Sequence, residues 1–199
     1  LALFSVCSLS FGYGEIDFDT NQKVLRAAAQ MDNTATNYLT VGRTWVKSDY
    51  QYKGLIASYI KTSGGRDINF NRNGATAGQL TFDFAGAGSD NLCSAILYAN
   101  AGFIAACRSM ESTGYYEIYL VKVDNSGTLD ATFGTNGIKK TGIGGNSTIG
   151  HAFVRGIIYD AATGTVGNNG TVVITGTTGK YAPGVFHPVS YTHLRAHET

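Results

Sequence analysis

Short apolar runs separated by polar, glycine-containing turns recur along the chain in a fixed order. The first run of each unit covers residues 24–32, 91–99 and 152–160, and the second covers 38–45, 102–109 and 171–178. Each second run is apolar up to a small residue, and these residues, Gly42, Cys107 and Gly176, are 65 and 69 positions apart. Such runs, bounded by turn residues and rich in β-branched and aromatic side chains, predict β-strands.

A third run and a compact loop complete the pattern in two of the units. The third run covers 55–62 and 117–124, with Lys61 and Lys122 expected at matching places, 61 apart. We name the loops that follow the first turn module, GGRDINFNRNG at residues 64–74, and the second turn module, GTLDATFGTNG at residues 127–137. The modules share Gly, Asp, Phe, Asn and Gly at the same five places, at an offset of 63. A fourth short strand is predicted after each, at 75–82 and 138–144.

Each shared residue of the second turn module has a local structural role. Gly127 supplies a positive φ, and Asp130 can accept hydrogen bonds from nearby backbone N–H groups. Phe133 would anchor the loop, and Asn136-Gly137 suits a type I′ hairpin turn. The first module repeats the same aspartate and asparagine, which favours turn building over ligand binding. A degraded copy, GEIDFDTNQ, is expected at residues 14–22.

The recurrence also predicts the fold class. A period of 60 to 70 residues with four short strands in each unit is typical of an all-β chain that forms a partial β-propeller, or propeller-like array, of four-stranded antiparallel blades. We assign residues 15–188 to about three such units. Closed propellers use about 4 to 8 blades, so we expect a fragment whose exposed strand edges favour aggregation.

The second turn module carries a family resemblance as well. The sequence GTLDATFGTNG after YLVKVDNSG, with a strand ending in a small residue about twenty residues upstream, resembles the delta-60 repeat family of bacterial exported or surface proteins. The resemblance covers about residues 14–188 and is tightest in the middle unit. It departs from the family pattern at Cys107, at INFN in the first module, and where the third unit stops before its module. It implies a β-propeller-like fold of no assigned biochemical activity and adds no catalytic residue.

The beginning of the chain and the net charge bear on compartment and partners. Residues 1–14, LALFSVCSLSFGYG, resemble a signal peptide that lacks its first residues, which predicts a secreted, periplasmic or cell-surface protein. The alternative is a first buried strand. The run has roughly 11 apolar or small residues, fewer than the ~20 that span a bilayer as a helix. That length predicts no membrane span. The formal net charge of +1 gives no electrostatic footprint for nucleic acid or an anionic membrane surface, so neither partner is expected.

The last residues have a different character. Residues 189–199, VSYTHLRAHET, share no rhythm with the repeats and resemble translated sequencing-adapter sequence, so we treat them as a non-native tail. His193 and His197 have helical i, i+4 spacing beside Glu198, but two ligands without a third, and without HExxH, do not predict a metal site. His151 lies inside the repeats and has no GxSxG motif to pair with.

The remaining candidate motifs have simpler explanations. DFDTN at residues 17–21 alternates oxygen ligands like a calcium loop, but it lacks the glycine and distal glutamate of such loops. DINFNRNG at 67–74 is explained by turn chemistry, and GIGGN at 142–146 lacks the GK[ST] of a phosphate loop. Tyr115, Tyr116 and Tyr119 could line a ligand surface, but strand alternation favours core packing. We therefore predict no catalytic residue, no metal site and no cofactor, and the ligand-binding residues stay unknown.

One pair of cysteines predicts a specific contact between two strands. Cys93 and Cys107 flank a hairpin centred near Asn100, which would set them opposite one another on paired strands. Directly opposed antiparallel residues lie about 4.5 to 5.5 Å apart, within or close to the range that a disulfide needs. If Cys7 leaves with a signal peptide, these are the cysteines of the mature chain. A disulfide and two small buried thiols both fit, because the register can slip by one.

The leading function hypothesis is an exported, non-enzymatic repeat scaffold that binds a protein or a glycan. The alternatives are a metal-dependent propeller hydrolase of the lactonase kind and a purely architectural segment of a large surface protein. The direction of the repeated aspartates separates the first two. If Asp67 and Asp130 line a channel with room for an ion, the hydrolase gains support; if they hydrogen-bond their own loops, it loses support.

Overall fold

The computed structural model describes residues 23–29, 36–84, 91–99, 102–160, 171–179 and 194–195. These residues form eleven β-strands and no helix, so the predicted all-β class is confirmed. The candidate signal peptide at 1–14, the calcium-like motif at 17–21, His193 and His197 lie outside the described residues.

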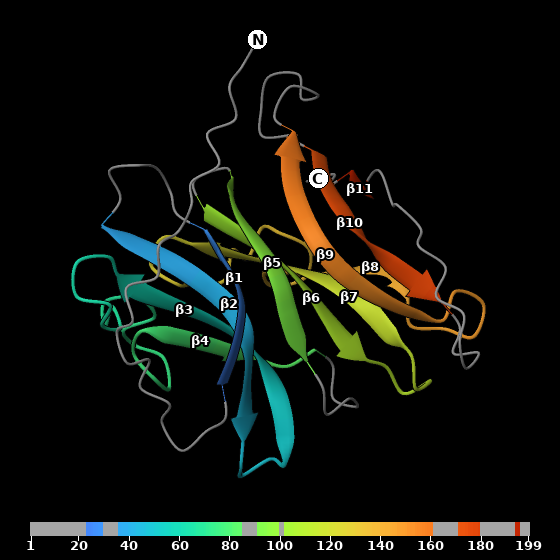
Figure 1. Cartoon of the computed structure of the whole chain (residues 1–199), viewed down its shortest axis with the longest axis horizontal. Helices are drawn as coiled ribbons and strands as arrows, with labels where there is room; N and C mark the ends of the chain where they lie inside the picture. The colour runs from blue at the N-terminus through green and yellow to red at the C-terminus, as the bar shows by residue number, and fades with distance from the viewer. Residues whose placement is uncertain are drawn as a thin grey trace.

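The strands form three antiparallel sheets, each in sequence order (Figure 1). The first sheet contains β1 (Lys23–Ala29), β2 (Asn37–Val46), β3 (Gln51–Ile60) and β4 (Gln79–Phe82). The second contains β5 (Leu92–Ala99), β6 (Gly102–Met110), β7 (Tyr116–Asp124) and β8 (Ile138–Gly144). The third contains β9 (His151–Asp160), β10 (Thr171–Gly179) and β11 (Leu194–Arg195). Four-stranded antiparallel sheets are thus confirmed for the first two units.

The second sheet lies between the other two and is buried on both faces. Side chains of β6 and β7 point alternately to opposite faces, as the pleat of a strand requires. One face packs against the first sheet through Phe103, Ala105, Cys107, Tyr119 and Val121. The other packs against the third sheet through Ile104, Ala106, Ile118 and Leu120. Burial on both faces explains why these strands are almost continuously apolar, and each fully buried aliphatic side chain stabilises the fold by about 1.5–3 kcal/mol.

The turn modules have the predicted local structure. Phe70 and Phe133 are both 2 % exposed. Phe70 belongs to the apolar core between the first and second sheets, and Phe133 to the core between the second and third. Asn136 and Gly137 have φ of 52° and 87°, as a type I′ turn requires, and they join Thr135 to Ile138 in a tight hairpin. The first module differs, because its positive φ values fall at Gly64 and Asn71, and at Gly78 just after it, and not at the Asn73-Gly74 pair. Its loop is therefore longer, and β4 begins at Gln79, four residues later than predicted.

The predicted match between Lys61 and Lys122 is wrong. The backbone N–H of Asp67 bonds to the carbonyl of Ser58, whereas that of Asp130 bonds to the carbonyl of Lys122. Ser58 is therefore the counterpart of Lys122, and Lys61 lies exposed in the turn after β3. Lys61 follows the end of β3 and lies three residues beyond the strand position that Lys122 occupies.

Two further features concern the joints between sheets. The first turn module contacts the second unit in the turn after β7, where the N–H of Asn71 donates to the carbonyl of Ser126 at 2.6 Å. A Cβ added to Gly127 would lie 2.8 Å from both Asn71 N and Phe70 Cζ, so the contact leaves no room for a side chain. Strands β1, β5 and β9, the first of each sheet, lie side by side (Figure 1).

Within the suspected tail, Leu194 and Arg195 pair with the edge of β10.

Candidate functional site

The aspartate of the first turn module is engaged within its own unit. Asp67 is buried, and its carboxylate accepts hydrogen bonds from Asn37 Nδ2 at 2.6 Å, Ser58 Oγ at 3.3 Å and the backbone N–H of Asn69 at 3.0 Å. These donors come from β2, β3 and the loop itself. The carboxylate therefore closes the turn, and both of its oxygens accept hydrogen bonds from protein groups.

The aspartate of the second turn module is engaged in the same way with a charged partner. Asp130 accepts from Lys122 Nζ at 2.8 Å, from the backbone N–H of Thr132 at 3.0 Å and from its hydroxyl at 2.6 Å. The bond from Lys122, with those from Thr132, lowers the pKa of Asp130 to about 2. Neither repeated aspartate is arranged for metal binding, and the part of the chain that the structure describes holds no cluster of three His, Cys, Asp or Glu side chains for a metal.

A charged network lies at the edge of the second sheet. Lys140 Nζ contacts Glu111 at 2.9 Å and Glu117 at 3.2 Å, and these pairs raise its pKa, Glu111 most. Tyr119 donates to Glu111 at 2.5 Å, and burial with this bond raises the pKa of Tyr119 to about 12. Glu117 also accepts from the N–H of Gly142, so the GIGGN loop is turned toward a carboxylate. An anion such as phosphate is repelled there, and the network is structural.

The two cysteines predicted to face each other do so. Cys93 and Cys107 are paired in register between β5 and β6, are fully buried, and their sulfurs form a disulfide. Next to this pair the register shifts, because Ser94 forms a β-bulge before Ala95 pairs with Ala106. The disulfide therefore holds β5 to β6 directly beside an irregularity in the strand.

The same bulge recurs in all three sheets at the same place. The pairing of β1 with β2 skips Arg26, and that of β9 with β10 skips Arg155, as the pairing of β5 with β6 skips Ser94. The residue before each bulge faces the small residue noted in the sequence: the pairs are Leu25–Gly42, Cys93–Cys107 and Val154–Gly176. A Cβ on Gly176 would collide with the carbonyl oxygen of Phe153. A bulge leaves its extra residue out of the ladder and redirects that side chain.

The three bulge residues line one pocket. This pocket, of about 270 Å³, is formed by Arg26, Ser94 and Arg155 together with Arg108 of β6 and the ring of Phe153. Its walls come from all three sheets, at the place where β1, β5 and β9 lie side by side. It is therefore a candidate ligand site among the described residues.

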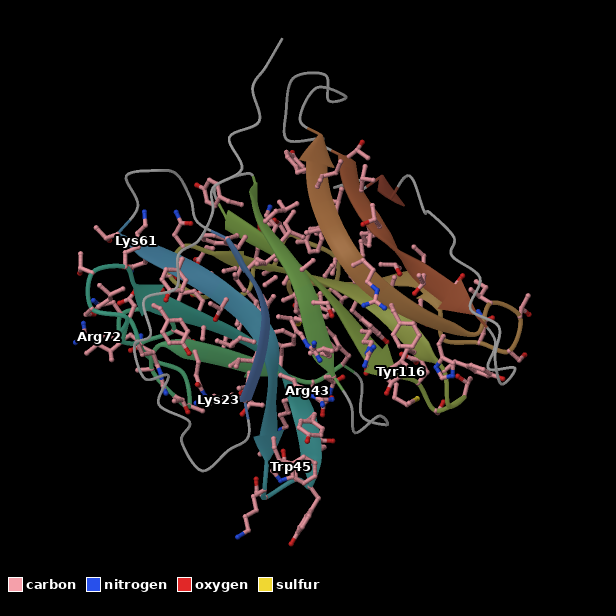
Figure 2. The ribbon with its side chains drawn as sticks, in the orientation of Figure 1. Lys23, Arg43, Trp45, Lys61, Arg72 and Tyr116 are labelled. Carbon is pink, nitrogen blue, oxygen red and sulfur yellow. A yellow bond between two sulfur atoms is a disulfide. The ribbon has the colours of Figure 1, made fainter. Side chains whose placement is uncertain are left out.

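Aromatic rings position the arginine from the middle sheet. The Arg108 guanidinium lies 4.4 Å from the ring centre of Tyr116 and 4.7 Å from that of Phe153. Tyr116, labelled in Figure 2, also contacts the ring of His151. Burial, and secondarily the positive charge of Arg108, lowers the pKa of His151. Of the three tyrosines weighed in the sequence, Tyr119 is in the core, whereas Tyr115 and Tyr116 are partly exposed beside His151.

Sequence reasoning did not find this pocket, although a pattern for it exists. Two apolar residues precede each bulge residue, in VLR at 24–26, LCS at 92–94 and FVR at 153–155. The predicted first runs, 24–32 and 91–99, align Arg26 of the first unit with Cys93 of the second, one residue away from its true counterpart, Ser94. Aligned by these triplets, the arginines and the serine fall at one position.

The described residues include no helix long and apolar enough to cross a membrane. Comparison of the chain with protein-family models, with curated proteins and with solved structures finds no match.

Proposed function

We propose that the chain is part of an exported repeat scaffold, of β-propeller-like architecture, that binds a protein or a glycan and does not catalyse a reaction. The sequential meanders and the side-by-side first strands β1, β5 and β9 support blades arranged about an axis. The resemblance of the second turn module to delta-60 repeats and the apolar residues 1–14 support export.

The pocket at the three bulges is the observation that carries the binding proposal. No single unit contains it, since Arg26, Ser94 and Arg155 belong to three different sheets. Ligand sites at the junction of repeats are typical of repeat proteins, in which neighbouring units create a shared surface. A purely architectural segment would not need the bulge residues to converge.

The competing hydrolase loses its specific support. Its convergent ligands would be the repeated aspartates, and Asp67 and Asp130 are instead bonded within their own units, by the loop and by neighbouring strands. The repeated polar residues build turns, whereas the pocket residues vary between units.

Binding to panels of immobilised glycans and of peptides tests this function. We expect the full chain to retain one of the two classes, and Ser94→Trp, which fills the pocket, to reduce that binding at least about tenfold, or about 1.4 kcal/mol. Ser63→Trp is the matched control, because Ser63 is exposed in the same turn as Lys61. Figure 2 shows Lys61 on the opposite side of the molecule from Tyr116.

Other outcomes would contradict the proposal. Retention of neither class, or equal binding by Ser94→Trp and the wild type, would remove the binding role. Chemical conversion of a retained ligand would favour the enzyme class. Because tryptophan at position 94 could disturb β5, Arg155→Trp at the exposed rim of the pocket serves as a second variant.

A further inference from the structure

The charge of the pocket points to the chemistry of its ligand. Each sheet contributes one arginine, Arg26 from β1, Arg108 from β6 and Arg155 from β9, and none of the described residues that line the pocket is Asp or Glu. Among the described residues, the ion pairs involve neither Arg26 nor Arg155. The chain as a whole has a formal net charge of only +1, so this concentration of positive charge is local.

The arginines are placed there by backbone structure. Arg26 and Arg155 occupy bulges, which release them from strand pairing and turn them toward the junction of the sheets. In the middle sheet the bulge residue is Ser94, and the charge comes instead from Arg108 on the adjacent strand. Charge is thus supplied by each sheet even where the bulge residue differs.

Arg108 is also held in a defined orientation. Its guanidinium is flanked by the rings of Tyr116 and Phe153, and Arg43 lies in the same way 3.9 Å from the ring centre of Tyr52 in the first sheet. An arginine held against aromatic rings has lost side-chain freedom before a ligand binds. Planar guanidinium groups bind carboxylate, sulfate and phosphate through paired, charge-assisted hydrogen bonds.

We propose that this pocket binds an oxyanion, a carboxylate, sulfate or phosphate group of the ligand, between Arg26, Arg108 and Arg155, with Phe153 as its apolar wall. The inference rests on the proposed function, because it assigns the ligand chemistry of the same pocket. A volume of about 270 Å³ admits one such group with the atoms that carry it. Neighbouring positive charge of this kind raises the local concentration of anions.

Calorimetric titration of the full chain at low salt tests the proposal. The probes are sodium sulfate, sodium phosphate, glucuronate and glucose, with sodium chloride at matched ionic strength as the reference. We expect at least one oxyanion to bind and glucose not to bind, with affinity falling as salt is added. The inorganic ions and glucuronate separate a free anion from the same chemistry carried on a sugar.

Variants locate the binding. Arg26→Gln with Arg155→Gln changes two exposed side chains and should weaken oxyanion binding at least about tenfold, or about 1.4 kcal/mol. Arg72→Gln, an exposed arginine at the far side of the molecule from Tyr116, should leave the affinity unchanged (Figure 2). Near-ultraviolet circular dichroism checks that each variant stays folded.

The outcomes separate this inference from the proposed function. Equal loss in Arg72→Gln, no loss in the double variant, or binding of glucose as tight as glucuronate would overturn the oxyanion site. If the Ser94→Trp variant blocks a neutral glycan or peptide while no oxyanion binds, the binding role stands and the inference fails. If oxyanions bind but neither panel is retained, the inference stands and the scaffold function fails.

Discussion

The two turn modules differ in loop length and in how they neutralise the aspartate they repeat. In the first, Asp67 is bonded by the neutral side chains of Asn37 and Ser58. In the second, Asp130 is bonded by the buried ammonium of Lys122, which also lies 6.0 Å from the ring centre of Phe133. The backbone N–H of the aspartate nevertheless bonds to the preceding strand in both modules, to the carbonyl of Ser58 in the first and of Lys122 in the second.

This difference shows which parts of a unit are interchangeable. The aspartate must accept the N–H two residues ahead, and that bond is 3.0 Å long in both modules. The donor to its second oxygen can be charged or neutral. The bulges also keep the backbone feature constant, while the residue at the bulge itself changes from arginine to serine. Recurrent residues build the units, and variation appears where the pocket is.

The largest test of the comparison is removal of the anchoring rings. We expect Phe70→Ala and Phe133→Ala each to lower the free energy of unfolding by about 3–5 kcal/mol, because each ring is buried and leaves a cavity. Urea denaturation measures both. If the modules are equivalent anchors, the two losses agree within about 1 kcal/mol, a margin set by the variation of such values with context. If one variant loses less than about 1 kcal/mol while the other loses about 3–5 kcal/mol, the two rings are not equivalent anchors.

A smaller effect tests the contact between the first module and the second sheet. Gly127→Ala must adopt a φ of 85° and place a Cβ against Phe70 and Asn71, whereas Gly114→Ala has a similar φ of 80° and open space. We expect a loss of about 1 kcal/mol for Gly114→Ala and about 2–3 kcal/mol for Gly127→Ala, measured by urea denaturation. Equal losses of unfolding free energy in the two variants would mean that the contact of Gly127 with Phe70 and Asn71 adds no further destabilisation.

The sequence was sufficient for the strands and the second turn module. Apolar runs bounded by turn residues placed the strands within a few residues, since burial on both faces keeps β6 and β7 apolar. Local chemistry predicted the asparagine-glycine turn at Asn136 because it depends only on φ at two residues. The first module was predicted less well, because its longer loop moves the left-handed positions to Asn71 and Gly78.

The cysteine pair was placed correctly by an incomplete argument. A hairpin centred on Asn100 would pair every residue with the same sum of positions, but Ala99 pairs with Gly102 and Ala95 with Ala106. The bulge at Ser94 then restores the register that pairs Cys93 with Cys107. A bulge arises from strand pairing and not from local composition, so neither it nor the arginine pocket could be read from single runs.

The smallest expected effect concerns the charge that distinguishes the second module. The pKa of Asp130 is about 2, below its ordinary value of 3.8, so folding favours the carboxylate. Its stabilising contribution is fully present above pH 3.8 and is lost as the pH falls toward 2. Because the side chain of Asp130 is partly exposed, solvent screening limits this contribution to under about 1 kcal/mol.

Urea denaturation at pH 5 and pH 2.5 measures that contribution by comparison of the wild type with Asp130→Asn and Lys122→Met. We expect both variants to lose less stability on acidification than the wild type, since one lacks the titrating carboxyl and the other lacks the main cause of its lowered pKa. An identical acid loss in all three proteins would mean that the ion pair contributes nothing to folding. The lysine would then act chiefly by covering Phe133. The charged donor to Asp130 would then stabilise its module no more than the neutral donors to Asp67 stabilise theirs.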